Sequence, residues 1–127
     1  MIITINKICD GNYIHGSSFH GDLYGKYFGK KMSIGKKCDV EIEVSKVFTI
    51  NDFKISNNKK FSVFSSNGMT TINGLVQQID DDILYILFDF DLIALEILSD
   101  VDYQSLLNQY VSFTFDDLKL YDTGLIS

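Results

Sequence analysis

The chain has no arginine, no proline and no tryptophan, and only two cysteines among its 127 residues. Because arginine supplies the bidentate donors that read phosphates and guanine edges, its absence argues against sequence-specific nucleic-acid binding. Without proline, the turns have to be made by Gly, Asn and Asp. Cys9 and Cys38 fit two reduced core thiols better than one disulfide, which favours a reducing compartment.

The sequence also lacks targeting and membrane signals. No apolar run is long enough to cross a bilayer, and the first residues lack the charged segment and apolar stretch of a signal peptide. We therefore expect a cytoplasmic protein without membrane association. Hydrophobic residues make up 46% of the chain, which is enough for a single packed β-rich domain over residues 1–127.

Short runs of β-branched and aliphatic residues, separated by Asn, Gly and Asp, predict antiparallel strands with tight turns. Residues 38–50 begin with a strict alternation of apolar and polar side chains, which indicates a strand with one buried face. Asn67-Gly68 predicts a hairpin between residues 61–66 and 69–79, because both positions of a type I′ turn need positive φ. Further turns are expected at Asp80–Asp82 and at Asp89–Asp91.

Two segments depart from this strand pattern. Residues 13–37 mix Gly, Lys and aromatic residues without a clear period, and we interpret them as a long ordered loop. Ser99 can cap a short α-helix that runs over residues 99–109. Together the patterns predict a mainly β protein, a small antiparallel β-barrel or sandwich with one short helix.

Charge is distributed unevenly along the chain. Residues 1–60 carry ten Lys and six acidic residues, whereas residues 61–127 carry one Lys and eleven acidic residues. If folding gathers the carboxylates, they form a negative surface that steers a basic protein partner toward it. The residues predicted to bind this partner are Asp80, Asp81, Asp82, Asp89, Asp91, Glu96, Glu41, Glu43, Asp116 and Asp117. The alternative interpretation of these acids is ordinary solubility.

The lysines and aromatic residues of 13–37 form an alternative ligand-binding surface. Aromatic faces beside cations are typical of single-stranded nucleic-acid binders. The residues that would serve are Tyr24, Lys26, Tyr27, Lys30 and Lys31. The missing arginine and the acidic second half weigh against nucleic acid as the partner.

Enzymatic chemistry has little support. The segment from His15 to Asp22 contains every residue type of a Ser-His-Asp triad, but side chains packed on one Gly-rich loop cannot hold a triad geometry. Cys9, His15, His20 and Asp22 are suitable zinc ligands, although their spacing matches no short zinc motif. We therefore expect no catalytic residues, no metal and no cofactor.

A resemblance covers about fifty residues, from 72 to 122. Ile72-Asn73-Gly74-Leu75-Val76 resembles the Gly-containing opening strand of TOBE domains, and residues 111–122 resemble their closing strand pair. For residues 72–122 this implies an OB-type barrel, with a helix between its third and fourth strands. The N-terminal segment does not fit that pattern, and no motif supplies the donors that TOBE-like oxyanion binding would need.

A second resemblance concerns the type of protein rather than a motif. Small acidic β proteins from chains rich in Ile, Asn and Lys resemble bacterial immunity proteins, which bind a cognate toxin. This implies a non-enzymatic protein that neutralises a basic, nuclease-type toxin through its acidic surface. The alternative is an OB-like nucleic-acid or small-ligand binding module that uses residues 13–37.

Overall fold

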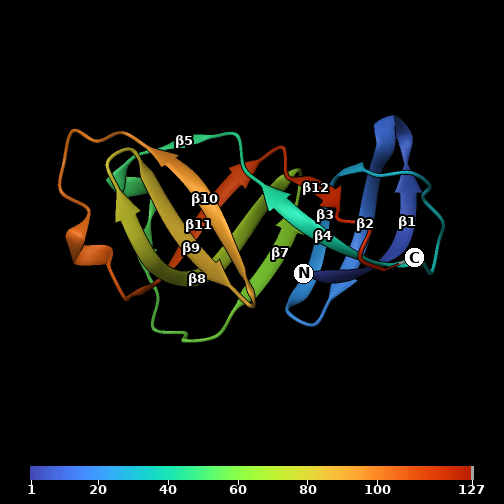
Figure 1. Ribbon diagram of the computed structural model, residues 1–127, viewed down its shortest axis with the longest axis horizontal. Helices are drawn as coiled ribbons and strands as arrows, with labels where there is room; N and C mark the ends of the chain where they lie inside the picture. The colour runs from blue at the N-terminus through green and yellow to red at the C-terminus, as the bar shows by residue number, and fades with distance from the viewer. Residues whose placement is uncertain (127) are drawn as a thin grey trace.

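The computed structural model describes residues 1–126, and it confirms a mainly β fold. The strands form two sheets that lie end to end in an elongated molecule (Figure 1). One sheet closes into a five-stranded barrel, and the other is an open sheet of seven strands. The chain leaves the barrel after its fourth strand, builds the open sheet, and returns to complete the barrel.

The barrel has the strand order β1-β2-β3-β12-β4. Its neighbours are antiparallel except for β12, which runs parallel to β3. Of residues 72–122, which resemble TOBE domains, only the last strand enters the barrel. The strands are β1 (Ile2–Cys9), β2 (Tyr13–Ser18), β3 (Gly21–Phe28), β4 (Lys37–Glu43) and β12 (Lys119–Asp122).

The open sheet has the order β5-β10-β9-β8-β11-β6, with β7 paired to the first half of β8. The parallel pair β5–β10 is two residues long, so β5 covers only one end of β10. The strands are β5 (Val47–Phe48), β6 (Lys54–Ile55), β7 (Ser62–Ser66), β8 (Met69–Asp80), β9 (Ile83–Phe88), β10 (Asp91–Ile97) and β11 (Tyr110–Asp116).

The loop predicted for residues 13–37 is wrong, because most of that segment forms the barrel strands β2 and β3. Glycines occupy inward positions in these strands and hide the alternation of apolar residues. Gly25 lies in β3 between the buried side chains of Leu23 and Tyr27. A Cβ there would lie 2.8 Å from the carbonyl oxygen of Leu118, so the close approach of the chain at this point requires glycine.

The hairpin predicted at Asn67-Gly68 is confirmed. Both residues have positive φ, 53° and 78°, and the turn joins β7 to β8. The turns predicted at the two later Asp clusters are also present, with positive φ at Asp81 and Asp89. Asn and Asp tolerate the left-handed region better than most residues, which explains turns without proline.

The α-helix predicted over residues 99–109 is reduced to one 3-10 turn at Gln104–Leu106. Asp102, rather than Ser99, accepts a hydrogen bond from the backbone N–H of Gln104. Asn108 has a φ of 64°, which ends the turn before a second helical turn can form. Within residues 1–126 there is no helix long and apolar enough to span a membrane.

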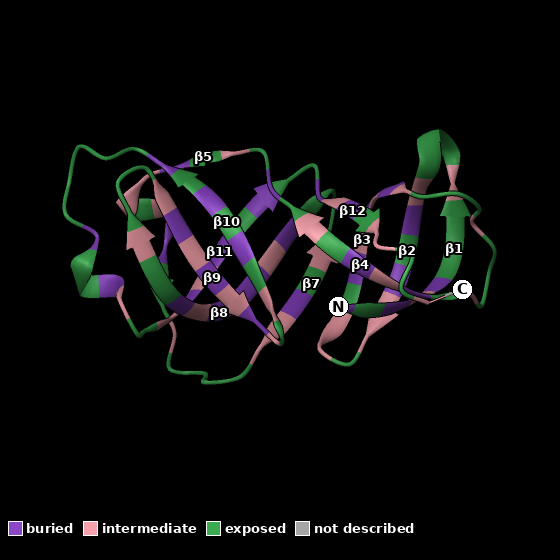
Figure 2. Cartoon of the chain, in the orientation of Figure 1, coloured by how far each residue is buried: buried purple, intermediate pink, exposed green. Residues whose placement is uncertain are grey.

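The two sheets share one continuous hydrophobic core. Buried and exposed residues alternate along strands such as β10, as Figure 2 shows. The open sheet is centred on an aromatic cluster in which Phe48, Phe53 and Phe113 have ring centroids 5.4 to 5.9 Å apart. These buried aromatic rings supply much of the apolar area that stabilises the sheet.

The turn between β2 and β3 connects the barrel to the open sheet. The backbone N–H of Val63 in β7 donates to the carbonyl oxygen of His20 at 3.0 Å. Next to it, a Cβ on Gly21 would lie 2.0 Å from the carbonyl oxygen of Val63. The backbones are therefore in direct contact at this junction, and only glycine fits there.

Candidate functional site

A groove runs between the barrel and the open sheet, bordered by β4 on one side and β10 on the other. Two adjoining hollows of about 340 and 450 Å³ lie along it, and a third of about 280 Å³ lies beside the N-terminal residues. Their walls combine carboxylates with apolar side chains. The groove residues are Asp39, Glu41, Ile42, Glu43, Phe88, Phe90, Asp91, Leu92, Ile93, Ala94 and Tyr121.

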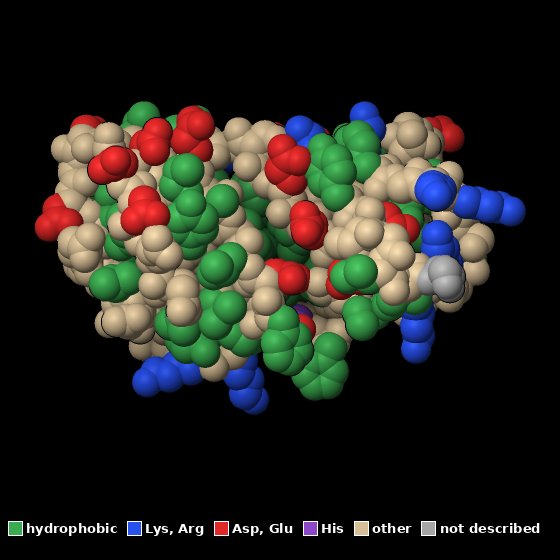
Figure 3. All heavy atoms as spheres, viewed as in Figure 1, with side chains coloured by type: hydrophobic (Ala, Val, Ile, Leu, Met, Phe, Trp, Pro, Cys, Tyr) green, Lys and Arg blue, Asp and Glu red, His purple; other side chains and the backbone are tan. Residues whose placement is uncertain are grey.

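Alternation in β4 places its acidic residues on the groove. Val40 and Cys38 point into the barrel core, so Asp39, Glu41 and Glu43 point outward. Figure 3 shows acidic side chains along the seam between the two sheets. Within residues 1–126, no ion pair neutralises Glu41 or Glu43, so both charges remain available to a ligand.

Asp39 and Asp91 face each other across the groove, and an ammonium group lies between them. The Met1 amino group is 3.1 Å from an oxygen of Asp39 and 2.6 Å from an oxygen of Asp91. Burial opposes the charge on this amine, but hydrogen bonds and attraction from the two carboxylates raise its pKa overall. The negative charge of the groove therefore comes mainly from Glu41 and Glu43.

Strand β10 presents an unpaired edge to the groove. Ile97 donates its N–H toward β9, to Asp82, whereas Leu98 donates toward β5, to Phe48. Because backbone direction alternates along a strand, the N–H and C=O groups of Leu92 and Ala94 point away from β9, as those of Leu98 do. Strand β5 pairs with β10 only at residues 96 and 97, so this edge has no partner strand among residues 1–126.

Within the part of the chain that the structure describes, strand β4 also has a stretch of edge without a partner strand, on the side that faces β10. The backbone N–H of Val40 donates to the carbonyl oxygen of Met1, on the side away from β12. Ile42 has the same backbone direction two residues later, where β1 no longer runs beside β4. Two strand edges with unpaired main-chain groups therefore border the same groove.

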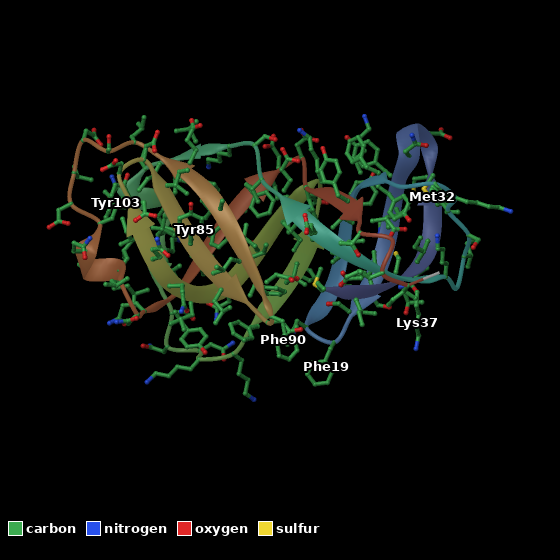
Figure 4. All side chains as sticks on the ribbon, viewed as in Figure 1. Phe19, Met32, Lys37, Tyr85, Phe90 and Tyr103 are labelled. Atoms are coloured by element: carbon green, nitrogen blue, oxygen red, sulfur yellow. The ribbon has the colours of Figure 1, made fainter. Side chains whose placement is uncertain are left out.

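Two phenylalanines project into solvent at one end of the groove. Phe19 lies in the β2–β3 turn and Phe90 in the β9–β10 turn, and each is 95% exposed. Both side chains line the hollow beside the N-terminal residues, and Figure 4 shows them close together. Exposed aromatic side chains next to a groove are typical of interaction surfaces rather than of packing.

The His20 ring packs edge-on against Phe19 and lines the same hollow as both phenylalanines. Its Nε2 is 3.4 Å from an oxygen of Asp89, and its ring packs edge-on against Phe61 and Phe88. The imidazole therefore connects the β2–β3 turn of the barrel to the β9–β10 turn of the open sheet. His20 therefore packs against and positions these two turns at the end of the groove beside Phe19.

The structure brings together only part of the acidic set predicted from the sequence. Glu41, Glu43 and Asp91 line the groove, and Asp89 lies at its end. A second group, formed by Glu96 and the three Asp of the β8–β9 turn, lies at the far end of the open sheet. Asp116 and Asp117 lie apart from both, at the break between β11 and β12 near Tyr24.

The alternative ligand-binding set is also divided. Tyr24 and Lys26 point outward from β3, whereas Tyr27 points into the barrel and is 3% exposed. Lys30 and Lys31 lie beyond the end of β3, in the segment that connects it to β4. Only Tyr24 and Lys26 therefore share a surface, which also includes Tyr13, whose ring stacks on Tyr24 at 5.3 Å.

The Tyr27 hydroxyl forms a hydrogen bond within the protein rather than facing a ligand. Its hydroxyl donates to a carboxylate oxygen of Asp122 in β12 at 2.5 Å. Burial, and then this hydrogen bond, raise the pKa of Tyr27, while the same hydrogen bond lowers the pKa of Asp122. This hydrogen bond connects β12, the last strand of the barrel, to β3.

The residues considered for catalysis or metal binding have other roles where the structure shows their contacts. Ser18 accepts a hydrogen bond from the N–H of His20 and donates to the carbonyl of Gly21, so it stabilises a turn. Cys9 and Cys38 are free thiols. Across the described residues, no three His, Cys, Asp or Glu side chains gather closely enough to hold a metal ion.

Sequence reasoning missed the apolar half of the groove. Phe90 was part of a predicted turn, and an aromatic residue between two turn-forming aspartates is a signal of exposure. Leu92 and Ala94 look like ordinary strand residues, and nothing local shows that the edge beside them stays unpaired. Comparison of the chain with known protein families, curated proteins and solved structures finds no match.

Proposed function

We propose that this protein is a non-enzymatic binding protein whose partner is a basic protein, and that it acts as an immunity protein against a nuclease-type toxin. The observation that carries the proposal is the convergence of the uncompensated Glu41 and Glu43 on a groove that also exposes Phe90 and Leu92. Carboxylates there would substitute for the phosphates of the toxin's substrate.

This combination suits protein binding in two ways. A concentrated negative charge attracts a basic partner and raises the association rate. Exposed aromatic and aliphatic side chains then supply the apolar contact area that slows dissociation. A cytoplasmic, bacterial protein that protects its own cell would need both properties.

The test is co-expression with the product of the adjacent gene, followed by measurement of association rates at low and physiological salt. The proposal predicts a complex that inhibits the partner's nuclease activity and an association rate that falls steeply with salt. Reversing two charges in the groove, Glu41→Lys with Glu43→Lys, should lower the association rate by about tenfold or more.

The matched control is the double variant Asp116→Lys with Asp117→Lys. It changes net charge by the same amount but lies outside the groove, so its association rate should stay within about twofold of the wild type. A rate that is flat with salt, or equal losses in the two double variants, would contradict the proposal.

A second candidate function is supported by one observation, the outward surface formed by Tyr13, Tyr24 and Lys26. Stacked tyrosines beside a lysine are suited to the bases and phosphates of a single strand. Fluorescence anisotropy with labelled oligothymidine at low salt tests this candidate. If no binding occurs, or if Tyr24→Ala with Lys26→Glu leaves binding unchanged, nucleic acid is not the ligand of this surface.

A further inference from the structure

We infer that the hollow lined by Phe19 and Phe90 binds an arginine side chain of the basic partner, with the two aromatic rings as its main contact. The inference rests on the proposed function and names the side chain that this surface recognises. The hollow has a volume of about 280 Å³ and lies beside the N-terminal residues. Both rings line it, although one comes from a turn of the barrel and the other from a turn of the open sheet (Figure 4).

The two rings contribute little to the packing of the protein. Each is 95% exposed, so neither buries much apolar area in the fold. Ile2 and Leu92, each 55% exposed, extend the apolar surface around them. Ile2 lines the same hollow, and Leu92 lines the adjoining one together with Phe90. A patch of exposed apolar side chains drawn from both sheets is a surface suited to contact with another molecule.

Short turns determine where the two rings lie. Phe19 lies in the β2–β3 turn, in which the Ser18 hydroxyl forms two hydrogen bonds to the turn backbone. Phe90 lies in the two-residue turn between β9 and β10. The contact of 3.4 Å between His20 Nε2 and a carboxylate oxygen of Asp89 joins the two turns. Rings presented by ordered turns lose little conformational freedom when a ligand binds.

The charges around the rings favour a cation as the ligand. The carboxylates of Asp39, Asp89 and Asp91 line the hollow, and the ammonium group of Met1 lies among them. Even with a protonated His20, the carboxylates outnumber the cations. The side chains of Asp89 and Asp91 are 31% and 41% exposed, and each carboxylate has two acceptor oxygens. Both can therefore accept further hydrogen bonds from a ligand.

Arginine suits this combination of rings and carboxylates better than lysine. Its planar guanidinium stacks on aromatic faces and donates in a fork that matches a carboxylate, whereas the lysine ammonium is a strongly hydrated point charge. The methylene groups of the arginine side chain can lie on the apolar surface of Ile2 while its charged end reaches Asp89 or Asp91. One side chain fills the hollow without displacing any strand.

A second copy of the protein is a poorer occupant of this patch. The chain contains no arginine, so another copy cannot supply a guanidinium. Two such patches facing each other would also bring their carboxylates together, and like charges across an interface are destabilising. Charge complementarity therefore selects the basic partner.

The probe for this inference is N-acetyl-arginine methylamide, titrated against the full chain at low salt while NMR follows the ring signals of Phe19 and Phe90. Its matched control is the citrulline derivative, which has nearly the same shape but a neutral urea in place of the guanidinium. We expect the citrulline derivative to bind about tenfold more weakly, because the attraction between cation and ring and the charge-assisted hydrogen bonds are lost. The lysine derivative should bind about threefold more weakly than the arginine derivative.

A pair of protein variants tests the rings themselves. Phe19→Ser combined with Phe90→Ser removes both aromatic faces and should lower the affinity for the arginine derivative about tenfold. Phe64→Ser is the matched control, because Phe64 is 63% exposed on β7 and does not line the hollow. Its affinity should stay within about twofold of the wild type. Circular dichroism checks that both variants fold, as the exposure of the replaced side chains predicts.

Every other result overturns the inference, and none of them is the result that would overturn the proposed function. If the arginine derivative leaves both ring signals unchanged, or binds no better than the citrulline derivative, the hollow does not select a cation. Equal binding of the lysine derivative would exclude a preference for arginine. A dimer in sedimentation that the double phenylalanine variant dissociates would assign the patch to a second copy. The proposed function fails separately, if the charge reversals at 41 and 43 leave the association rate of the co-expressed partner unchanged.

Discussion

The barrel closes on itself, whereas the open sheet leaves the edge of β10 unpaired at Leu92 and Ala94. Closure pairs the barrel strands along most of their length and, among residues 1–126, leaves the end of β4 at Ile42 unpaired on one side, whereas an open sheet keeps its edges. The two sheets also differ in charge, because most lysines lie in the barrel half of the sequence and most acids in the open sheet. We propose that a partner binds where the edge of the open sheet meets the acidic barrel strand β4.

The two sheets are joined where the backbone at Gly21 lies against the carbonyl of Val63. Replacement by alanine places a methyl group against the carbonyl of Val63, at a φ of +136° that an L-residue rarely adopts. We expect Gly21→Ala to lower the free energy of unfolding by about 3 kcal/mol or more. Urea unfolding followed by NMR of isoleucine methyl groups in both sheets measures the loss and shows whether the sheets unfold together.

Gly35→Ala is the matched control for this substitution. Gly35 also has positive φ, +87°, but no atom lies within 4 Å of a Cβ built there. Its cost should be limited to backbone strain of about 1 kcal/mol. Equal losses in the two variants would show that the contact with Val63 does not hold the sheets together.

The pattern of side chains predicted the open sheet better than the barrel. In residues 61–98, turn residues and β-branched runs specify each hairpin locally, so the strands and turns follow from the sequence. In residues 13–28, Gly25 occupies an inward strand position because Leu118, distant in sequence, passes close by. Local periodicity cannot reveal a glycine required by a distant segment.

The candidate site was predictable only in part, for a related reason. The outward acids of β4 follow from alternation within one strand, so Glu41 and Glu43 were identified. That they face β10, while Asp116 and Asp117 do not, depends on where the chain crosses between the sheets. The sequence gives no indication of this, because Glu43 and Leu92 lie 49 positions apart and meet only in the folded molecule.

Closure of the barrel can be tested at its last strand through Tyr27→Phe. The variant loses the hydrogen bond from the hydroxyl to the Asp122 carboxylate, and we expect a loss of about 1–2 kcal/mol in unfolding free energy near neutral pH. Tyr24→Phe is the control, because the Tyr24 ring lies on the outer surface of the barrel.

The pH dependence of this pair has a defined sign. The hydrogen bond from Tyr27 is the largest cause of the lowered pKa of Asp122. A lowered folded-state pKa stabilises the fold above the ordinary aspartate pKa, and this stabilisation is lost as pH falls through the folded value. The difference between wild type and Tyr27→Phe should therefore shrink in acid. A difference that stays constant down to pH about 2 would contradict this assignment.

The smallest expected effect on stability is at the groove itself, in Phe90→Ser. Since the side chain is 95% exposed, its removal should change the free energy of unfolding by less than about 0.5 kcal/mol. A larger loss would mean that Phe90 packs against the protein and supports the junction between the sheets. A negligible loss would show that this exposed aromatic side chain does not stabilise the fold and is free to contact the proposed partner. Urea unfolding and binding measurements on the same variant separate these two roles.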